Sequence, residues 1–131
     1  MRLRPKQTPF RLTLGERGEM IAWGHLREKG YTLLEKNYRC ALGEMDVIAR
    51  KNGRLVFVEI KTRSSDRFGL PEEAVHSVKQ KKLLKLAQWY LKEKKATEKP
   101  VAFAVLGILW EEGKEPEIRL IEQAFSADSE K

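Results

Sequence analysis

The sequence predicts an α/β fold in which helices flank a mixed central sheet. Three observations support this: a helical segment at 13–29, two β-branched runs joined by Asn-Gly at 52–53, and a helical segment at 78–94 that precedes an apolar run at 101–109. Asn-Gly is typical of an antiparallel hairpin, whereas a strand reached through a helix is typical of parallel pairing. The predicted order is α-β-β-β-α-β-β, with an extra edge strand at the C-terminal end.

The first helix has recognisable signals at both ends. Thr13 and Glu16 have the spacing of a capping box, in which each side chain accepts the backbone N–H of the other residue. Gly30 is the expected C-terminal stop, so the helix should end near Lys29. Residues 31–38 then favour a first strand that leads into the hairpin.

The register of the hairpin determines where its acidic side chains lie. Asn-Gly at 52–53 can take positive φ at both positions, so a two-residue type I′ turn fixes the pairing of the strands. Counting back from the turn places Asp46 opposite Glu59 and Glu44 opposite Lys61. Alternation puts Asp46, Glu59 and Lys61 on one face. The other face is apolar and contains Val56, Val58 and Ile60.

The second half of the chain supplies a crossover helix and two further strands. Pro71 suits the first turn of a short helical segment, and Ser77 is the expected N-cap of the helix at 78–94. The run at 101–109 has the pattern of a strand buried on both faces, and 117–121 should pair back with it. The apolar stripe of the helix comprises Leu83, Leu86, Ala87 and Tyr90.

Length and composition limit the class of protein. With 131 residues, 41% of them hydrophobic and 34% charged, the chain fits a single domain with its own core. Within 1–131 we expect a flexible basic arm at 1–12, a core at 13–125 and a disordered tail at 126–131. No apolar run approaches the length of a membrane span, so we expect no membrane partner.

Charge and cysteine content indicate which binding partners and which cellular compartment to expect. The formal net charge of +7 favours phosphate-rich partners such as nucleic acid, although general solubility explains it about as well. The single cysteine, Cys40, excludes an intrachain disulfide and fits a reducing cytoplasm. His25 and His76 are the only histidines, which argues against a Cys/His zinc site.

Opposed carboxylates in a sheet need a compensating cation. Like charges about 5 Å apart, at an effective dielectric constant of about 20, repel by roughly 3 kcal/mol. Lys61, two residues beyond Glu59, could compensate Asp46 and Glu59, or a metal could, since Asp and Glu with waters are a usual ligand set for Mg²⁺. The alternative is a solvated polar face, but Leu55 and Phe57 share that face and argue against it.

Several charged and aromatic residues on the helices have two interpretations. Glu19 shares a helical face with Ala22 and Leu26, so it is either a third acidic group of the site or a carboxylate favoured by the helix dipole. Lys79 either faces the acidic cluster or a phosphate, or covers apolar surface with its stem. We expect Trp89 to pack rather than to stack on bases. The other lysines should form a solvated face: Lys81, Lys82 and Lys85.

Asp46, followed by a hairpin and by Glu59-Ile60-Lys61, resembles the PD-(D/E)XK signature of the restriction-endonuclease-like nucleases, whose core has the order αβββαβ. Met45 stands where that signature usually has proline. Further motifs between about residues 15 and 110 resemble the bacterial YraN-type family of uncharacterised nuclease-like proteins. They are Gly18-Glu19, Gly30-Tyr31, Asn37-Tyr38-Arg39, Gly43-Glu44-Met45-Asp46, Phe57 to Arg63, Phe68-Gly69 and Lys79.

The resemblance implies a nuclease that depends on Mg²⁺ or Mn²⁺ and acts on nucleic acid, with DNA as the expected partner. Similarity to archaeal Holliday-junction resolvases, at the level of fold, extends this to branched DNA and to a homodimer. The implied metal ligands are Asp46, Glu59, the main-chain carbonyl of Ile60, and Glu19, and Lys61 would orient the attacking water. The implied nucleic-acid-binding residues are Arg39, Arg63, Arg67 and Lys79, with Asn37 supporting the site.

One departure from the family pattern leaves a second function class open. Ala102-Phe103-Ala104 stands where that family often has Arg-Phe-Asp, so the role of that Arg or Asp is missing. The alternative is a non-catalytic nucleic-acid-binding module of a DNA repair or recombination complex. The set of Asp46, Glu59 and Lys61 argues against it, because binding alone does not require opposed carboxylates.

Overall fold

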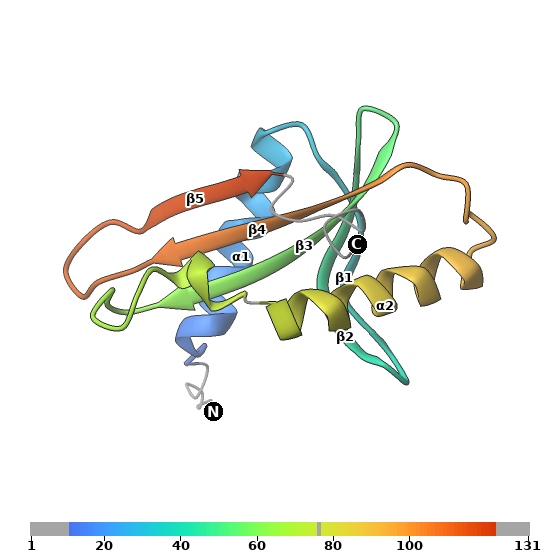
Figure 1. Cartoon of the computed structure of the whole chain (residues 1–131). Coiled ribbons are helices and arrows are strands. Elements are labelled where there is room, and N and C mark those ends of the chain that lie inside the picture. The colour runs from blue at the N-terminus through green and yellow to red at the C-terminus, as the bar shows by residue number, and fades with distance from the viewer. Residues whose placement is uncertain (1–10, 76, 123–131) are drawn as a thin grey trace, which may run out of the picture.

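The computed structural model describes residues 11–75 and 77–122, and its elements follow the predicted order (Figure 1). They are α1 (Leu14–Glu28), β1 (Thr32–Cys40), β2 (Gly43–Lys51), β3 (Arg54–Arg63), the 3₁₀ helix η2 (Pro71–Ala74), α2 (Ser77–Glu93), β4 (Val101–Leu109) and β5 (Glu117–Glu122). The predicted tail lies outside the described residues, as does most of the predicted arm. Ser77 is already helical, so it is not the N-cap of α2, and residue 76 is not described.

The five strands form one mixed sheet, as predicted, and their order across it is β1-β2-β3-β4-β5. β3 and β4 are parallel and are connected through α2, whereas all other neighbours are antiparallel. The helices cover opposite faces of the sheet, with α1 behind it and α2 in front of it in Figure 1. No described helix is long and apolar enough to cross a membrane.

The two faces of the sheet bury separate apolar clusters. The cluster under α2 includes Phe57 and Phe103, whose rings stack 5.5 Å apart. The cluster under α1 includes Val58 and Leu106, which come from the alternate positions of the same two strands. β4 is therefore buried on both faces, as its continuous apolar run predicted, because each helix covers one of its faces.

The predicted signals at the ends of α1 are confirmed. The Thr13 side chain accepts the Glu16 N–H at 3.0 Å, and the Glu16 carboxylate accepts the Thr13 N–H at 2.9 Å. Gly30 has a φ of +93°, which an L side chain rarely adopts. This turn lets the Tyr31 N–H donate to the Leu26 carbonyl at 3.0 Å and starts β1 one residue later.

The hairpin register is confirmed near the turn and differs from the prediction farther away. Lys51 pairs with Arg54, and the ladder continues to Val47 opposite Val58. It ends there, so the predicted backbone pairs of Asp46 with Glu59 and of Glu44 with Lys61 are not formed. The Asp46 side chain instead accepts the backbone N–H of Ile60 on β3. Its carboxylate thus takes the place of a main-chain carbonyl as the acceptor. Side-chain alternation along β2 is also interrupted here, because residues 45 and 48 both face α2.

A glycine lets α1 approach β3 closely. Gly18 is buried, and a Cβ at this position would lie 2.9 Å from Cβ and 3.0 Å from Cγ2 of Thr62. Real Cβ atoms essentially never approach another carbon so closely, so the helix and strand would have to separate. The contact fixes the start of α1, including Glu19, beside the end of β3.

Candidate active site

The two predicted acidic residues of the hairpin share one pocket. It has a volume of about 240 Å³ and lies between the diverging strands β2 and β3 and the first half of α2. We call it the acidic pocket. Its lining comprises Glu44, Asp46, Glu59, Lys79, Lys82, Leu83 and Leu86. The side chains of Asp46 and Glu59 therefore converge as predicted, although the two residues do not pair through their backbones.

Asp46 is anchored by the main chain of β3. Its Oδ2 atom accepts the backbone N–H of Ile60 at 2.7 Å. Burial raises the pKa of Asp46 to about 7, with a further increase from the neighbouring Glu59 carboxylate and a smaller one from Glu19. The hydrogen bond from Ile60 lowers this pKa but does not offset burial. The folded chain therefore holds the proton of this carboxyl group more tightly than an exposed aspartate would.

Glu59 is buried and is paired with a cation from α2. Only 9% of the residue is exposed, and its Oε2 atom lies 2.9 Å from Nζ of Lys79. Hydrogen bonding to Glu59 in turn raises the pKa of Lys79. The other carboxylate oxygen, Oε1, is buried and has no hydrogen-bond partner among the described residues. Glu59 thus keeps one oxygen available for a further ligand.

Lys61, one of the two compensating cations that the sequence allowed, does not pair with Asp46 or Glu59 in the structure. Lys61 is exposed and contacts neither carboxylate through an ion pair or hydrogen bond in the described part of the chain. Lys79 provides the compensating charge instead, because the start of α2 brings its ammonium to 2.9 Å from Glu59 on β3. Of the two interpretations of Lys79, the structure shows the one in which it faces the acidic cluster.

Glu19 lies next to the acidic pocket without joining it. Burial raises the pKa of Glu19, repulsion by Glu44 raises it further, and a hydrogen bond from the Asn37 side chain lowers it. Within residues 11–75 and 77–122, no three His, Cys, Asp or Glu side chains are grouped as a metal site. Glu19 is therefore near enough to affect Asp46 electrostatically, but it lies outside a direct ligand set.

None of the three predicted arginines lines the acidic pocket in the described part of the chain. Arg39 is exposed and pairs with Glu44 at 3.3 Å. Arg63 donates to the carbonyl of Phe68 at 3.4 Å, which closes the loop after β3. Arg67 is exposed in that loop and has no partner among the described residues. Sequence reasoning assigned Lys82 to a solvated face, although its position one turn after Lys79 could have indicated that it lines the pocket.

The donor atoms present fit a hard divalent cation. Asp46 and Glu59 offer carboxylate oxygens, one of them buried and unpartnered, and the adjacent Ile60 carries a carbonyl. Oxygen ligands of this kind, completed by water, suit Mg²⁺ or Mn²⁺. Among the described residues no histidine or cysteine, the usual ligands of zinc, lines the acidic pocket.

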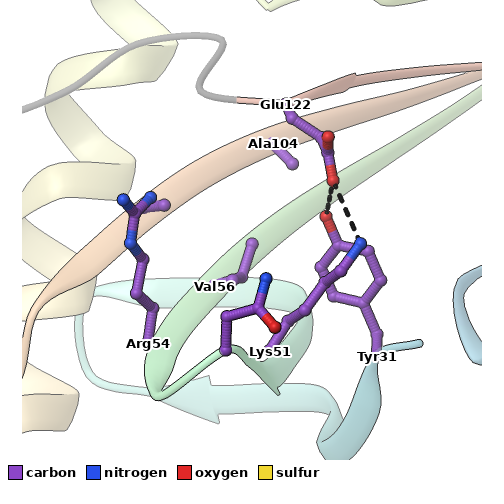
Figure 2. Close-up of a pocket in the computed structure, with 8 residues that line it drawn as sticks. Tyr31, Lys51, Arg54, Val56, Ala104 and Glu122 are labelled. Carbon is purple, nitrogen blue, oxygen red and sulfur yellow. Dashed lines mark hydrogen bonds and ion pairs between the residues drawn. The ribbon is translucent and has the colours of Figure 1, made fainter. Parts of the chain in front are cut away.

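A second cavity lies at the other end of the sheet, on the face that α1 covers (Figure 2). It has a volume of about 350 Å³ and is lined in part by Ala102 and Ala104. The Tyr31 hydroxyl donates to Glu122 there, and Lys51 Nζ lies 3.7 Å from the same carboxylate. The departure from the Arg-Phe-Asp pattern therefore changes this cavity and leaves the acidic pocket intact.

Asp46→Asn is expected to stabilise the metal-free protein at neutral and alkaline pH. The pKa of Asp46 is about 7 in the folded chain against an ordinary 3.8, so the native state binds this proton more tightly than the unfolded state does. The stability that this bound proton contributes is fully present below about pH 4 and is lost as the pH rises towards 7. Asparagine cannot ionise and avoids this loss.

The measurement is the melting temperature of both proteins in chelator, at acidic and alkaline pH. The variant should melt like the wild type near pH 4 and clearly above it at pH 8. A difference that does not change with pH would contradict a raised pKa for Asp46.

Comparison with known proteins gives consistent matches along the chain. The profile of the family described as "Uncharacterised protein family UPF0102" matches residues 18–108. A UPF0102 protein of Syntrophotalea carbinolica is 42% identical over 118 residues, which cover 90% of this chain and 95% of that protein. One of Geotalea daltonii is 44% identical over 113 residues, covering 86% and 89%. One of Caldanaerobacter subterraneus is 53% identical over 79 residues, covering 60% and 65%.

Proposed function

The chain belongs to the UPF0102 family, the YraN-type family that its motifs resemble, and we propose that it is a metal-dependent nuclease that hydrolyses phosphodiester bonds in DNA. One observation carries the proposal: two carboxylates from adjacent strands, Asp46 and Glu59, converge in a pocket beside lysines. A fold gains no stability from such a pair, because burial and mutual repulsion both raise the pKa of Asp46. Pairs of this kind are typical of sites that bind cations or transfer protons.

In this proposal the cation is Mg²⁺ or Mn²⁺, held by Asp46, Glu59 and the Ile60 carbonyl, with Glu19 acting through water. When bound, the ion supplies an activated water and offsets negative charge on the phosphate. Asp46 would release its proton on binding, because a ligating carboxylate must be ionised. Its anchor on Ile60 keeps the carboxylate in place during that change.

The surrounding cations have separate roles in the proposal. Lys61 has an exposed ammonium without a partner in the described chain, so it is free to contact the scissile phosphate and to orient the water. Lys79 balances the charge of Glu59, and it would turn to a flanking phosphate once a metal takes that carboxylate. Arg39, Arg63 and Arg67 lie farther out and would contact phosphates beyond the cleavage site.

A cleavage screen tests the proposed function. Single-stranded, duplex, flap and four-way DNA, with RNA strands for comparison, are incubated with Mg²⁺, Mn²⁺ or chelator. We expect cleavage of at least one DNA form with Mn²⁺ or Mg²⁺, and none in chelator. Failure to cut any form under conditions where the protein binds Mn²⁺ would contradict the nuclease proposal.

One observation favours a second candidate, a non-catalytic nucleic-acid-binding module. Lys79 already neutralises Glu59, and the described residues provide no third carboxylate in a metal-type group. A pocket of this kind could bind phosphates through its lysines without cutting them. The two candidates differ in metal affinity, which calorimetry measures directly.

Lys79→Ala is expected to bind Mn²⁺ about 2- to 10-fold more tightly than the wild type, because it removes an ammonium that competes for Glu59. The measurement is calorimetric titration with Mn²⁺ at neutral pH. Lys114→Ala is the matched control, since Lys114 pairs with Glu111 at the β4–β5 turn and should leave the affinity unchanged. If neither the wild type nor Lys79→Ala binds Mn²⁺ in the millimolar range, the binding module becomes the better candidate.

A further inference from the structure

α2 carries an exposed stripe that the proposed chemistry does not use. Spacings of three, four and three residues place Lys82, Lys85, Trp89 and Lys92 on one side of the helix, away from its buried stripe. Trp89 remains 42% exposed, so the expectation that it packs is wrong. It fails because the apolar stripe on the other side of α2 already fills the core.

Trp89 lies in a groove of about 590 Å³ between α2 and the β1–β2 turn, which we call the Trp89 groove. Leu42 and Leu91 supply apolar surface beside the indole, and Lys85 and Lys92 line the groove with it. No acidic side chain lines this groove within the described residues. The nearby Glu93 accepts a hydrogen bond from the Tyr38 hydroxyl at 2.7 Å. The groove thus combines an exposed aromatic face with two cations.

We propose that the Trp89 groove binds a single-stranded segment of the nucleic-acid substrate, with a base stacked on Trp89 and phosphates on Lys85 and Lys92. The inference rests on the proposed function in taking nucleic acid as the partner. Aromatic faces between cations are the usual means of holding single strands, because every base has a π-face and every nucleotide a phosphate. A duplex would use the lysines but has no unstacked base for the tryptophan.

The stripe connects the Trp89 groove to the acidic pocket. Lys82 lines the pocket and lies one turn before Lys85 on the same side of α2. From position 82 to 92 the helix rises about 15 Å, so a bound strand would run along α2 between the two sites. The substrate class inferred is therefore DNA with a single-stranded arm beside the bond that is cut, rather than continuous duplex.

Charge argues against a second copy of the chain as the occupant. Two identical grooves would bring Lys85 and Lys92 of one copy against the same residues of the other, and like charges in a contact disfavour it. A strand of nucleic acid presents the opposite charge. Self-association through Trp89 is nevertheless measured below, as an outcome that would overturn the inference.

The test measures binding in chelator, where no cleavage occurs. The probes are a labelled oligothymidylate and the same strand annealed to its complement, followed by fluorescence anisotropy. Trp89→Ala should bind the single strand about 5- to 150-fold more weakly, the loss expected for one base–aromatic stack. Its affinity for the duplex should stay within about twofold, because no phosphate contact is lost. Trp89→Phe, which keeps an aromatic face, should recover most of the single-strand affinity.

The lysines give an independent readout through salt. For the single strand, Lys85→Ala combined with Lys92→Ala should reduce the slope of log affinity against log salt by about 1.4, or about 0.7 for each lost phosphate contact. Lys114→Ala, at the distant β4–β5 turn, should leave the slope unchanged. Equal slopes for the wild type and the double variant would overturn the assignment of these lysines.

Three results would overturn the inference: an unchanged single-strand affinity in Trp89→Ala, an equal loss for single strand and duplex, or a wild-type dimer that Trp89→Ala dissociates. Failure here and failure of the nuclease proposal are distinguishable. If the Trp89 effect is present but no DNA is ever cut, the groove assignment stands and the nuclease proposal fails. If flap DNA is cut equally well by Trp89→Ala, the nuclease proposal stands and the groove assignment fails.

Discussion

Asp46→Asn is expected to lower metal-dependent cleavage of DNA by more than about 100-fold, since even supporting residues of metal ligands cost 10- to 100-fold when they are lost. Asparagine has the shape of aspartate and keeps an oxygen to accept the Ile60 N–H. It removes only the charge that a metal ligand must carry. The measurement is the single-turnover rate of cleavage of labelled flap DNA with Mn²⁺. Urea unfolding of the variant and the wild type shows whether the fold is retained.

Two further variants make this result specific to the acidic pocket. Asp66→Asn makes the same chemical change in the exposed loop after β3 and should cut at the wild-type rate. Lys61→Ala should slow cleavage while leaving Mn²⁺ affinity unchanged, because its ammonium is not a metal ligand. Cleavage that persists in Asp46→Asn would place the active site elsewhere on the protein.

Gly18→Ala is expected to lower the free energy of unfolding by about 1–3 kcal/mol, the usual cost of inserting a methyl group into a tightly packed contact. The new Cβ would lie 2.9 Å from Cβ of Thr62, so α1 would have to move away from β3. Glu19 would move with it. The measurement is urea unfolding followed by far-ultraviolet circular dichroism.

Gly24→Ala, on the same helix, is the matched control and should have the opposite sign. Nothing lies within 4 Å of a Cβ at position 24. Alanine there should raise the free energy of unfolding by about 0.5–1 kcal/mol, because it reduces the entropy that the backbone loses on folding. Similar values for the two variants would show that the contact with Thr62 does not restrict the side chain at position 18.

The parts of the fold that depend on neighbouring residues could be predicted from the sequence. Asn-Gly at 52–53 fixed the hairpin register near the turn, since φ is +53° and +76° at its two residues, as a type I′ turn requires. The capping box of Thr13 and Glu16 fixed the start of α1. The separation of β2 from β3 at Asp46 could not be predicted, because it depends on a side chain that outcompetes the backbone for one N–H.

The two acidic residues of the candidate site could be predicted from the sequence. The lysine that balances their charge could not. Asp46 and Glu59 lie on one hairpin, so counting along two strands was enough to bring them together. The pairing of Lys79 with Glu59 depends on how α2 crosses the sheet, which no local pattern encodes. For the same reason the exposure of Trp89 was missed: it depends on which side of α2 the sheet occupies.

The anchor of Asp46 has a consequence for how this protein tolerates mutation. The carboxylate is held by the amide of residue 60, which every amino acid except proline possesses. Replacing Ile60 by valine or leucine would change a few apolar contacts and leave the hydrogen bond to Asp46 in place. The position of Asp46 thus does not depend on which side chain residue 60 carries. At position 60 only proline would remove the hydrogen bond, because it has no backbone N–H.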